Sequence, residues 1–597
     1  MNDIARTDTQ TQSKAGWGSD LVAELLRALE IPYIALTPGA SFRGLHDSLV
    51  NHLGNTRPEL LLCIHEESAV ALAHGYARVT GRPLAVALHA NVGLMHATMA
   101  IFNAWCDRIP MLMLGGVGPI DASKRRPWVD WIHTSRDLGA LVRGYVKWDD
   151  QPGSIPAALE AILRAHRIMM TLPQGPVYVS LDAALQEEDV PVPLALPELD
   201  RYQPAAAGTP SDESVREVAR LLHKAARPLV MIGRVTGDPA DFARRVALAE
   251  RLGAAVITDI KTGATFPTRH RLHPFPPSLY VTGGATRLIT DADVILSLDW
   301  IDLGGTLRQA CGGEMPKARV IHCSLDQYVH TGHHMDYQSL PPTDLSILAP
   351  PDSLVAALVA KLGKGATTAH ESWPAPAPAD MATEAASQWN DRMPLADLAR
   401  VTTDSLAQHN PSYIRLPLGW PGEFCRFAHP HDYIGFDGGG GIGSGPGMAV
   451  GAALALRGGD RLPVAVLGDG DYLMGVTALW TGVHYRIPVL IIIANNQSFF
   501  NDELHQERMA RMRGRPVENR WIGLRMSDPE MDLAGMARDQ GAIGYGPVRT
   551  PDALAAAIEQ GIADVRAGRM AVIDARVAPE YSRAVSASLM RNIPARN

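Results

Sequence analysis

Short, almost uninterrupted apolar runs recur along the whole chain, separated by amphipathic or Ala-rich stretches with helical spacing. An apolar run without polar alternation is typical of a strand buried on both faces, as in a parallel sheet covered by helices. The clearest runs are residues 83–90, 110–116, 176–182, 227–233, 292–299, 462–470, 487–496 and 570–577. This pattern predicts an α/β fold made of doubly wound parallel sheets.

Two Pro-rich segments interrupt the alternation and divide the 597 residues into three parts. Residues 190–212 begin with VPVPLALPELD, and residues 364–385 contain PAPAPA, which favours an extended polyproline conformation. A chain of this length is too long for one hydrophobic core, so several domains are expected. We predict three parallel-sheet domains, at residues 1–190, 200–365 and 386–590.

Charge and cysteine usage narrow the class of protein. Lys and Arg total 55 against 63 Asp and Glu, a net charge of −8 without long runs of either sign, which disfavours nucleic acid or an anionic membrane as partner. The N-terminal residues are polar and lack the apolar core of a signal peptide, and no apolar segment reaches the ~18 residues that span a bilayer. The five cysteines lack CxxC spacing, which favours free thiols in a reducing compartment. We expect a cytoplasmic protein that acts on a small molecule.

A carboxylate between two glycines and a pair of asparagines each end a predicted strand in the last third of the chain. Residues 468–470 read GDG, and Asn495 and Asn496 follow after 24 intervening residues, of which residues 472–486 have helical spacing. The carboxyl ends of neighbouring parallel strands meet at one edge of a sheet, so Asp469 and the asparagines should lie together. Oxygen donors of this kind suit Mg²⁺, which completes its octahedron with phosphate oxygens and water. The pattern predicts a Mg²⁺-bound diphosphate; a tight turn followed by an Asn-rich loop is the alternative.

This spacing resembles the signature of the thiamine diphosphate (ThDP) enzymes in the 2-oxo acid decarboxylase and acetolactate synthase superfamily. The resemblance covers nearly the whole chain and implies a pyrimidine-binding, a middle and a diphosphate-binding domain, in that order. It assigns Mg²⁺ to Asp469, Asn496 and the main-chain oxygen of Ser498. The cofactor-binding residues that it implies beside them are Gly468, Gly470 and Asp471.

A glycine-rich stretch at residues 432–456 contains GxGxxG at Gly438, Gly440 and Gly443, which could indicate a dinucleotide fold. However, no acidic residue convincingly ends a second strand about twenty residues later, as that fold requires. In ThDP enzymes this place holds a glycine carbonyl that faces the aminopyrimidine and a bulky residue that bends the cofactor. The resemblance therefore assigns these roles to Gly440 and Ile442. The middle domain shows no flavin fingerprint, so FAD is not expected.

Glu66 and Glu67 lie where a predicted strand enters a helix, a place where the helix dipole favours any carboxylate. In ThDP enzymes a carboxylate hydrogen-bonded to the pyrimidine promotes removal of the thiazolium C2 proton. The family pattern places this Glu nine residues before the Gly of GYA, which selects Glu66 as the catalytic and cofactor-binding residue. Glu67 is then expected to be solvated or paired.

Residues 88–116 resemble the benzoylformate decarboxylase branch in particular, because a histidine ends the strand and NAW follows. The resemblance makes His89 a catalytic and substrate-contacting residue, since a near-neutral histidine can transfer protons to the reacting carbons and oxygens. His65 and His96 are expected to pack or to support the site. Two departures stand out. Ala40 occupies the place of a substrate-binding serine, so the adjacent Ser41 is the candidate substrate residue unless its side chain points elsewhere, and residues 297–309 lack a second catalytic histidine.

The resemblance implies a ThDP- and Mg²⁺-dependent C–C lyase, a 2-oxo acid decarboxylase with carboligase activity like benzoylformate decarboxylase. An acetolactate synthase-like carboligase or an acyloin- or diketone-cleaving lyase is the alternative. A catalytically silent homologue and an NAD-linked oxidoreductase are more distant ones. In this superfamily two chains complete each site, so a homodimer is the minimum and a homotetramer is expected. The charged residues 501–532 either face the substrate or form a solvated helix face.

Overall fold

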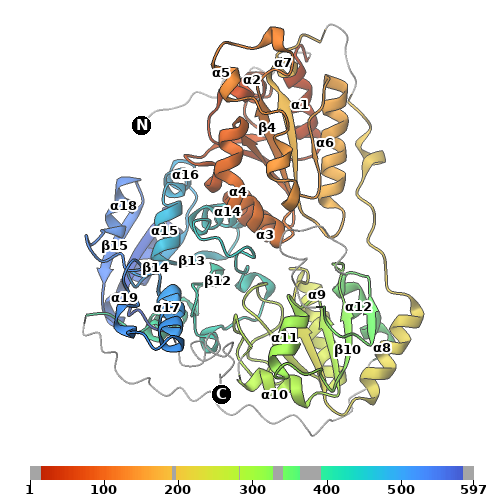
Figure 1. Ribbon diagram of the computed structural model, residues 1–597, viewed down its shortest axis with the longest axis vertical. Helices are drawn as coiled ribbons and strands as arrows, with labels where there is room; N and C mark the ends of the chain where they lie inside the picture. Colours follow the sequence, from red (N-terminus) through yellow and green to blue (C-terminus); the bar gives the residue numbers. More distant parts are fainter. Residues whose placement is uncertain (1–14, 191–195, 282, 327–339, 364–390, 582–597) are drawn as a thin grey trace. The chain divides into compact units, whose positions relative to one another are not determined.

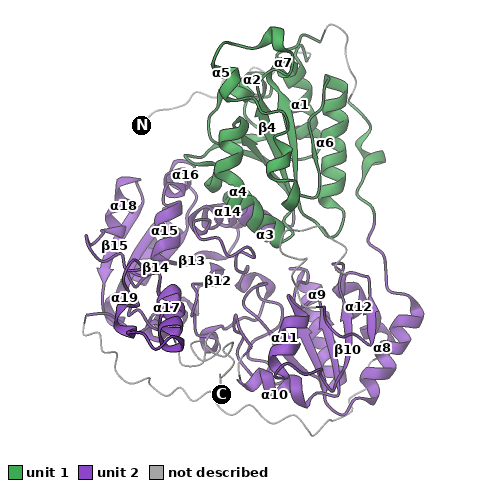
Figure 2. Cartoon of the chain, viewed as in Figure 1, with its two compact units in different colours: residues 1–73, 82–205 green, residues 74–81, 206–597 purple. Residues whose placement is uncertain are grey.

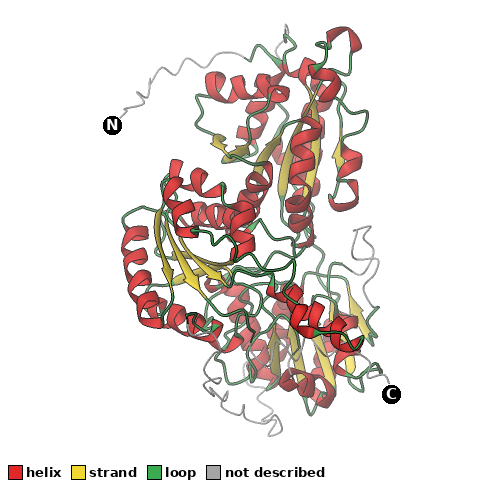
Figure 3. Ribbon diagram, turned by 60° about the vertical axis from the view of Figure 1, so that its left-hand side comes forward, coloured by secondary structure: helices red, strands yellow, loops and turns green. Residues whose placement is uncertain are grey.

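The computed structural model describes residues 15–190, 196–281, 283–326, 340–363 and 391–581. The predicted linker at 364–385 lies outside the described residues, as do residues 191–195 of the first linker and the first fourteen residues of the chain. In the described part the strands form three separate sheets, each wholly parallel and flanked by helices (Figures 1 and 3). The predicted α/β fold with three doubly wound parallel sheets is confirmed.

The first sheet has six strands in the order β2-β1-β3-β4-β6-β5. Its strands are β1 Tyr33–Leu36, β2 Glu59–Leu62, β3 Leu84–Leu88, β4 Met111–Val117, β5 Asp149–Asp150 and β6 Pro176–Asp182. The helices around it are α1 Gly18–Ala28, α2 Arg43–Asp47, α3 Glu66–Thr80, α4 Ala90–Cys106, α5 Val129–Ile132, α6 Ile155–Met170 and α7 Ala183–Gln186. Every residue of β3, β4 and β6 is buried, which explains their uninterrupted apolar sequences.

The second sheet has five strands in the order β11-β10-β9-β7-β8. They are β7 Pro228–Ile232, β8 Ala255–Thr258, β9 Val294–Leu298, β10 Arg319–Cys323 and β11 Leu345–Ile347. The accompanying helices are α8 Asp212–Lys224, α9 Pro239–Leu252, α10 Gly283–Asp291, α11 Leu303–Ala310 and α12 Pro351–Leu362.

The third sheet also has five strands, in the order β12-β13-β14-β16-β15. They are β12 Pro411–Arg415, β13 Leu462–Gly468, β14 Leu490–Asn495, β15 Ile543–Val548 and β16 Ala571–Arg576. The accompanying helices are α13 Leu395–Leu406, α14 Gly445–Leu456, α15 Asp469–Gly475, α16 Ala478–His484, α17 Phe500–Met512, α18 Leu533–Asp539 and α19 Pro551–Arg566. The central strand β14 is buried along its whole length.

Figure 2 divides the chain into two compact units. Unit 1 comprises residues 1–73 and 82–205 and contains the first sheet; unit 2 comprises residues 74–81 and 206–597 and contains the other two. The three domain boundaries drawn from the Pro-rich segments therefore stay a prediction.

All five cysteines are free thiols, and four of them are buried. In the described chain, no helix combines the length and the apolar character that crossing a membrane requires.

Candidate active site

Asp469 and the two asparagines lie at one edge of the third sheet. Strand β13 ends at Gly468, and α15 begins with Asp469, while the neighbouring parallel strand β14 ends at Asn495. Gly468 pairs in register with Ala494, so the two strand ends are adjacent. The connecting segment forms two short helices, α15 and α16, which complete the predicted βαβ unit.

One cavity of about 290 Å³ in unit 2 collects every residue of that unit that the sequence assigned to the cofactor or the metal. Its lining includes Gly440, Ile442, Gly468, Asp469, Gly470, Asp471, Asn496 and Ser498. These residues come from the glycine-rich loop and from both strand ends of the βαβ unit. The roles of the individual residues remain predictions.

Asp469 is a buried carboxylate that forms no salt bridge with any described residue. Only 5 % of it is exposed, and it accepts hydrogen bonds from the backbone N–H groups of Gly470 at 2.8 Å and Gln497 at 2.5 Å. Burial raises the pKa of this carboxyl group to about 6, and within the described chain no Lys, Arg or His forms a salt bridge with it. A buried charge is costly unless it is paired or binds a metal. The site therefore suits a cation.

The two asparagines face different ways. Asn495 is 2 % exposed, and its amide donates a hydrogen bond to the Asp574 carboxylate at 2.8 Å. Asn496 lines the cavity, and its side-chain oxygen accepts the N–H of Ser498 at 2.8 Å. Of the two, only Asn496 is among the described residues that line the cavity.

Among the described residues that line the cavity, Arg415 is the one Lys or Arg, and its charge is already neutralised. Its guanidinium contacts Asp437 at 2.8 Å and Asp471 at 3.0 Å. The second oxygen of Asp471 accepts the N–H groups of Gly443 and Gly445 at 2.7 and 3.1 Å, so this carboxylate also orders the glycine-rich loop. A diphosphate in this cavity would thus meet no unpaired Lys or Arg among the described lining residues.

The glycine-rich stretch does not have the strand-turn-helix geometry of a dinucleotide site. The preceding named strand, β12, ends at Arg415, well before Gly438, although α14 follows. Gly440 has a φ of +68°, a left-handed conformation that glycine adopts without strain, and it lines the cavity beside Ile442.

Part of the charged segment 501–532 packs back onto the strand-end loop. Glu503 on α17 is fully buried and accepts hydrogen bonds from the Ser498 hydroxyl at 2.5 Å and from the Arg525 guanidinium at 2.9 Å. Ser498 and Arg525 also form an antiparallel β-bridge. At Glu503 the solvated-face alternative is therefore wrong, because its charge is buried and holds the Ser498 loop.

In unit 1, His89 lies at the end of β3, directly before α4. The Ser41 hydroxyl is 2.8 Å from His89 Nδ1, within hydrogen-bond distance, so Ser41 points at the histidine. The imidazole fits because Gly39 has no side chain: a Cβ there would lie 2.4 Å from His89 Cγ.

His133 is a residue that the sequence did not single out. It follows α5, and its ring centroid lies 4.5 Å from that of His89. Burial, and then the neighbouring His133, lower the pKa of His89, while Glu66 acts in the opposite direction. A neutral His89 can accept a proton near pH 7. The WIHT sequence around His133 has no spacing that links it to His89, so only the fold brings the two histidines together.

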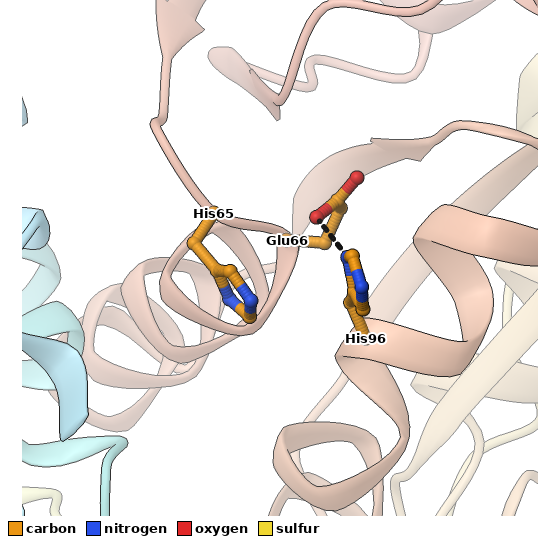
Figure 4. Close-up of side chains that lie close together, drawn as sticks. All are labelled: His65, Glu66 and His96. Atoms are coloured by element: carbon orange, nitrogen blue, oxygen red, sulfur yellow. Dashed lines mark hydrogen bonds and ion pairs between the residues drawn. The ribbon is translucent and has the colours of Figure 1, made fainter.

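Glu66 begins α3 and is 6 % exposed. Its Oε2 lies 3.1 Å from His96 Nδ1 (Figure 4), and the His65 ring stacks on that of His96 at 5.1 Å between centroids. Glu67 is half-buried, and its N–H donates to His65 Nδ1 at 3.2 Å. Potential ligand atoms of His65, Glu66 and His96 lie within 4.8 Å of one another, close enough to bind a metal ion. The buried Glu66 carboxylate also fits the pyrimidine-contacting role that the sequence predicts for it.

Glu66 and His89 are near neighbours across Gly93 on α4. A Cβ on Gly93 would lie 3.2 Å from Glu66 Oε1 and 3.3 Å from His89 Cβ. Unit 1 therefore brings one buried carboxylate and two contacting histidines, with a serine hydroxyl, into one region.

Two domain families match the chain. Residues 16–138 match the thiamine pyrophosphate enzyme N-terminal TPP binding domain, and residues 418–575 match the thiamine pyrophosphate enzyme C-terminal TPP binding domain. Thiamine pyrophosphate, or TPP, is ThDP. The first match contains Glu66, His89 and His133, and the second contains Asp469, Asn496 and Ser498.

The similar proteins are decarboxylases and synthases. Benzoylformate decarboxylase from Pseudomonas aeruginosa is 26 % identical over 74 % of this chain and 79 % of its own. The acetolactate synthase large subunit from Haemophilus influenzae is 23 % identical over 91 % of both chains.

Two solved structures share the fold. That of the ThDP-dependent 4-hydroxybenzoylformate decarboxylase from Rhodococcus jostii RHA1 has a TM-score of 0.74 at 23 % identity, and benzoylformate decarboxylase from Polynucleobacter necessarius has 0.77 at 20 %. Each likeness covers 95 % of this chain and 100 % of the other. With an N-terminal and a C-terminal TPP-binding domain present in that order, the chain is recognised as a ThDP-dependent enzyme that is similar to benzoylformate decarboxylases and acetolactate synthases.

Proposed function

We propose that this protein is a Mg²⁺- and ThDP-dependent C–C lyase that decarboxylates a 2-oxo acid and can pass the resulting carbon fragment to a second carbonyl. The observation that supports this most is the Asp469 cavity, where a buried carboxylate has no basic side chain paired with it among the described residues and the arginine of the described lining is already neutralised. An anionic diphosphate would be repelled there without a divalent ion.

The donor set fits Mg²⁺. Asp469 supplies a carboxylate oxygen, Asn496 an amide oxygen and Ser498 a main-chain oxygen, all hard ligands of the kind Mg²⁺ prefers. A divalent ion would neutralise Asp469 and would leave positions for two phosphate oxygens and water. Gly468 and Gly470 keep side chains away from that end of the cavity, while Gly440 and Ile442 border the place assigned to the pyrimidine and thiazolium rings.

When bound, ThDP supplies an electron sink for the carbanion that decarboxylation leaves behind. Glu66 is suited to hold a proton on the pyrimidine ring, because its carboxylate is buried and anchored at the start of α3. Its contact with the half-exposed His96 gives that carboxylate a neighbour through which protons can reach solvent.

His89 and His133 are suited to move protons at the substrate carbonyl and at the product. His89 is held by the Ser41 hydroxyl on one side and by the His133 ring on the other. We assign His133 the second acid–base role, for which residues 297–309 provide no histidine. The pair can then deliver a proton at two successive stages, one ring taking protons from the other.

An acetolactate synthase-like carboligase or an acyloin-cleaving lyase is the second candidate. The Haemophilus influenzae relative, which spans 91 % of this chain, favours it. A catalytically silent homologue is disfavoured, since such a chain need not keep Glu66 together with Asp469 and Asn496. We further propose a cytoplasmic enzyme without FAD whose minimum active form is a homodimer, with a homotetramer as the full assembly.

The test is a screen of metal-free, cofactor-free enzyme against 2-oxo acids and acyloins, read by mass spectrometry with and without added ThDP and Mg²⁺. The proposal expects carbon dioxide and an aldehyde or acyloin from at least one 2-oxo acid, only when both additions are present. Turnover that survives chelation, or cleavage of acyloins alone, would contradict the decarboxylase proposal.

A further inference from the structure

A second cavity, of about 690 Å³, lies in unit 1 within the segment that follows β4. Its lining is dominated by Arg125, Arg126, Arg136, Trp128 and Trp131. It shares no residue with the Asp469 cavity or with the Ser41, His89 and Glu66 cluster. The function proposed above leaves it unused.

The two tryptophans are unusually exposed for residues that line a cavity. Trp128 is 69 % and Trp131 77 % exposed, although a large apolar ring is normally covered. Trp128 also has a φ of +63°, a left-handed conformation that is strained for a bulky residue. Strain of this kind tends to occur at binding sites, where a side chain is held in position for a ligand.

The cavity is also positively charged. Arg126 pairs with Asp130 at 2.9 Å, but the Arg125 guanidinium donates only to the backbone carbonyls of Pro119 and Ile120, and thus keeps its charge. Arg136 is exposed and has no ion pair in the described part of the chain. Three guanidinium groups minus the one carboxylate of Asp130 leave a net charge of +2 on the lining.

We propose that this cavity binds a nucleoside phosphate, with the base stacked on Trp128 and Trp131 and the phosphates on Arg125 and Arg136. A volume of about 690 Å³ lies in the range of ligands larger than a small 2-oxo acid. An inorganic anion would leave the indoles uncovered, whereas an apolar molecule would desolvate the guanidiniums without pairing them. A planar ring joined to a phosphate satisfies both, because aromatic rings stack on bases and Arg pairs with phosphate oxygens.

The cavity lies next to the segment that carries His133, so a bound ligand could influence the reaction. Thr134 and Ser135 line it and directly follow His133, whose ring contacts His89. A nucleotide bound there would contact the segment that positions His133 and could change the position of that ring.

The test is calorimetric titration of the enzyme, preloaded with ThDP and Mg²⁺, with ADP, adenosine and pyrophosphate. Preloading fills the cofactor's diphosphate site, so that ADP binding reports another one. We expect ADP to bind more tightly than pyrophosphate and adenosine. Trp131→Ala should weaken ADP about 10-fold but leave pyrophosphate unchanged, since it removes a stacking partner. Arg136→Ala should weaken both anions about 10-fold by removing a phosphate contact.

Arg164→Ala is the matched control, because Arg164 is an exposed arginine of unit 1 outside the cavity. It should bind ADP like the parent. Absence of ADP binding, or ADP affinity equal in the parent, Trp131→Ala and Arg136→Ala proteins, would overturn the proposal. Pyrophosphate binding as tight as ADP, unaffected by Trp131→Ala, would reduce the site to an anion site and overturn the nucleoside assignment. These outcomes do not depend on the proposed lyase activity, because each is a binding measurement.

Discussion

The Asp469 cavity of unit 2 and the histidine cluster of unit 1 are built in different ways. In unit 2, Asp469 and Asn496 belong to one βαβ unit, with few residues between them. In unit 1, Ser41, Glu66, His89 and His133 come from four separate segments that follow different strands. One site is local in sequence, whereas the other exists only once the sheet has formed.

Their electrostatics differ as well. The unit 2 cavity holds an unpaired buried carboxylate, and burial raises its pKa to about 6. In unit 1, burial lowers the pKa of His89, so that this ring tends to be neutral. Under the proposed function, anchoring of the cofactor would depend on the charge of Asp469, whereas the His89 step would depend on a neutral imidazole held by its neighbours.

The largest effect is expected from a substitution in the Asp469 cavity. Asp469→Ala removes the one charged metal ligand, so the affinity for ThDP in the presence of Mg²⁺ should fall on the order of 100-fold or more. Activity should be lost at cofactor concentrations that saturate the parent. Calorimetry measures the affinity, and Asp564→Ala, which removes another buried carboxylate of unit 2 outside the cavity, is the control. Equal ThDP affinity in the parent and in Asp469→Ala would show that the diphosphate site is misplaced.

The next largest effect is expected from a substitution in the histidine cluster, which should leave ThDP binding unchanged. His89→Ala should slow turnover roughly 10²–10⁴-fold, the range for a lost acid–base group, with ThDP affinity unchanged. His133→Ala should slow turnover less. In the double variant the fold-loss in turnover should not exceed the product of the two single fold-losses, because the rings act as a pair. Steady-state kinetics on the identified substrate give these ratios. A fully active His89→Ala protein would make the cluster structural.

The difference between the two sites explains which of their residues could be predicted from the sequence. Continuous apolar runs predicted the parallel strands, since a doubly covered sheet requires them. GDG and NN predicted the unit 2 cavity, because their spacing alone places two strand ends together. His133 escaped prediction, because nothing local relates it to His89, and the buried role of Glu503 was hidden by its charged surroundings.

A smaller effect is expected in the pH dependence of cofactor binding, which reports the charge of Asp469. Because the metal-free Asp469 has a pKa of about 6, protons compete with Mg²⁺ below that pH. Above pH 6 the carboxylate is charged and the affinity should be constant; below it the affinity should fall about 10-fold per pH unit, as the charged fraction does. Titration of ThDP and Mg²⁺ into the enzyme at several pH values tests this. In Asp469→Asn the affinity should be weak and should lack this dependence on pH; a slope that persists in the variant would assign the titration to another group.

The central claim is that unit 1 of one chain and unit 2 of its partner complete one cofactor site. Glu66→Gln should bind ThDP without activating it, and Asp469→Ala should fail to hold it, so each variant alone should be inactive. After subunit exchange in equal amounts, half of the dimers are mixed, and each mixed dimer has one intact site of two. Recovered activity should therefore approach about one quarter of the parent's. Confirmed mixed dimers without any activity would contradict the claim, because Glu66 and Asp469 would then serve the same chain or one of them would be wrongly assigned.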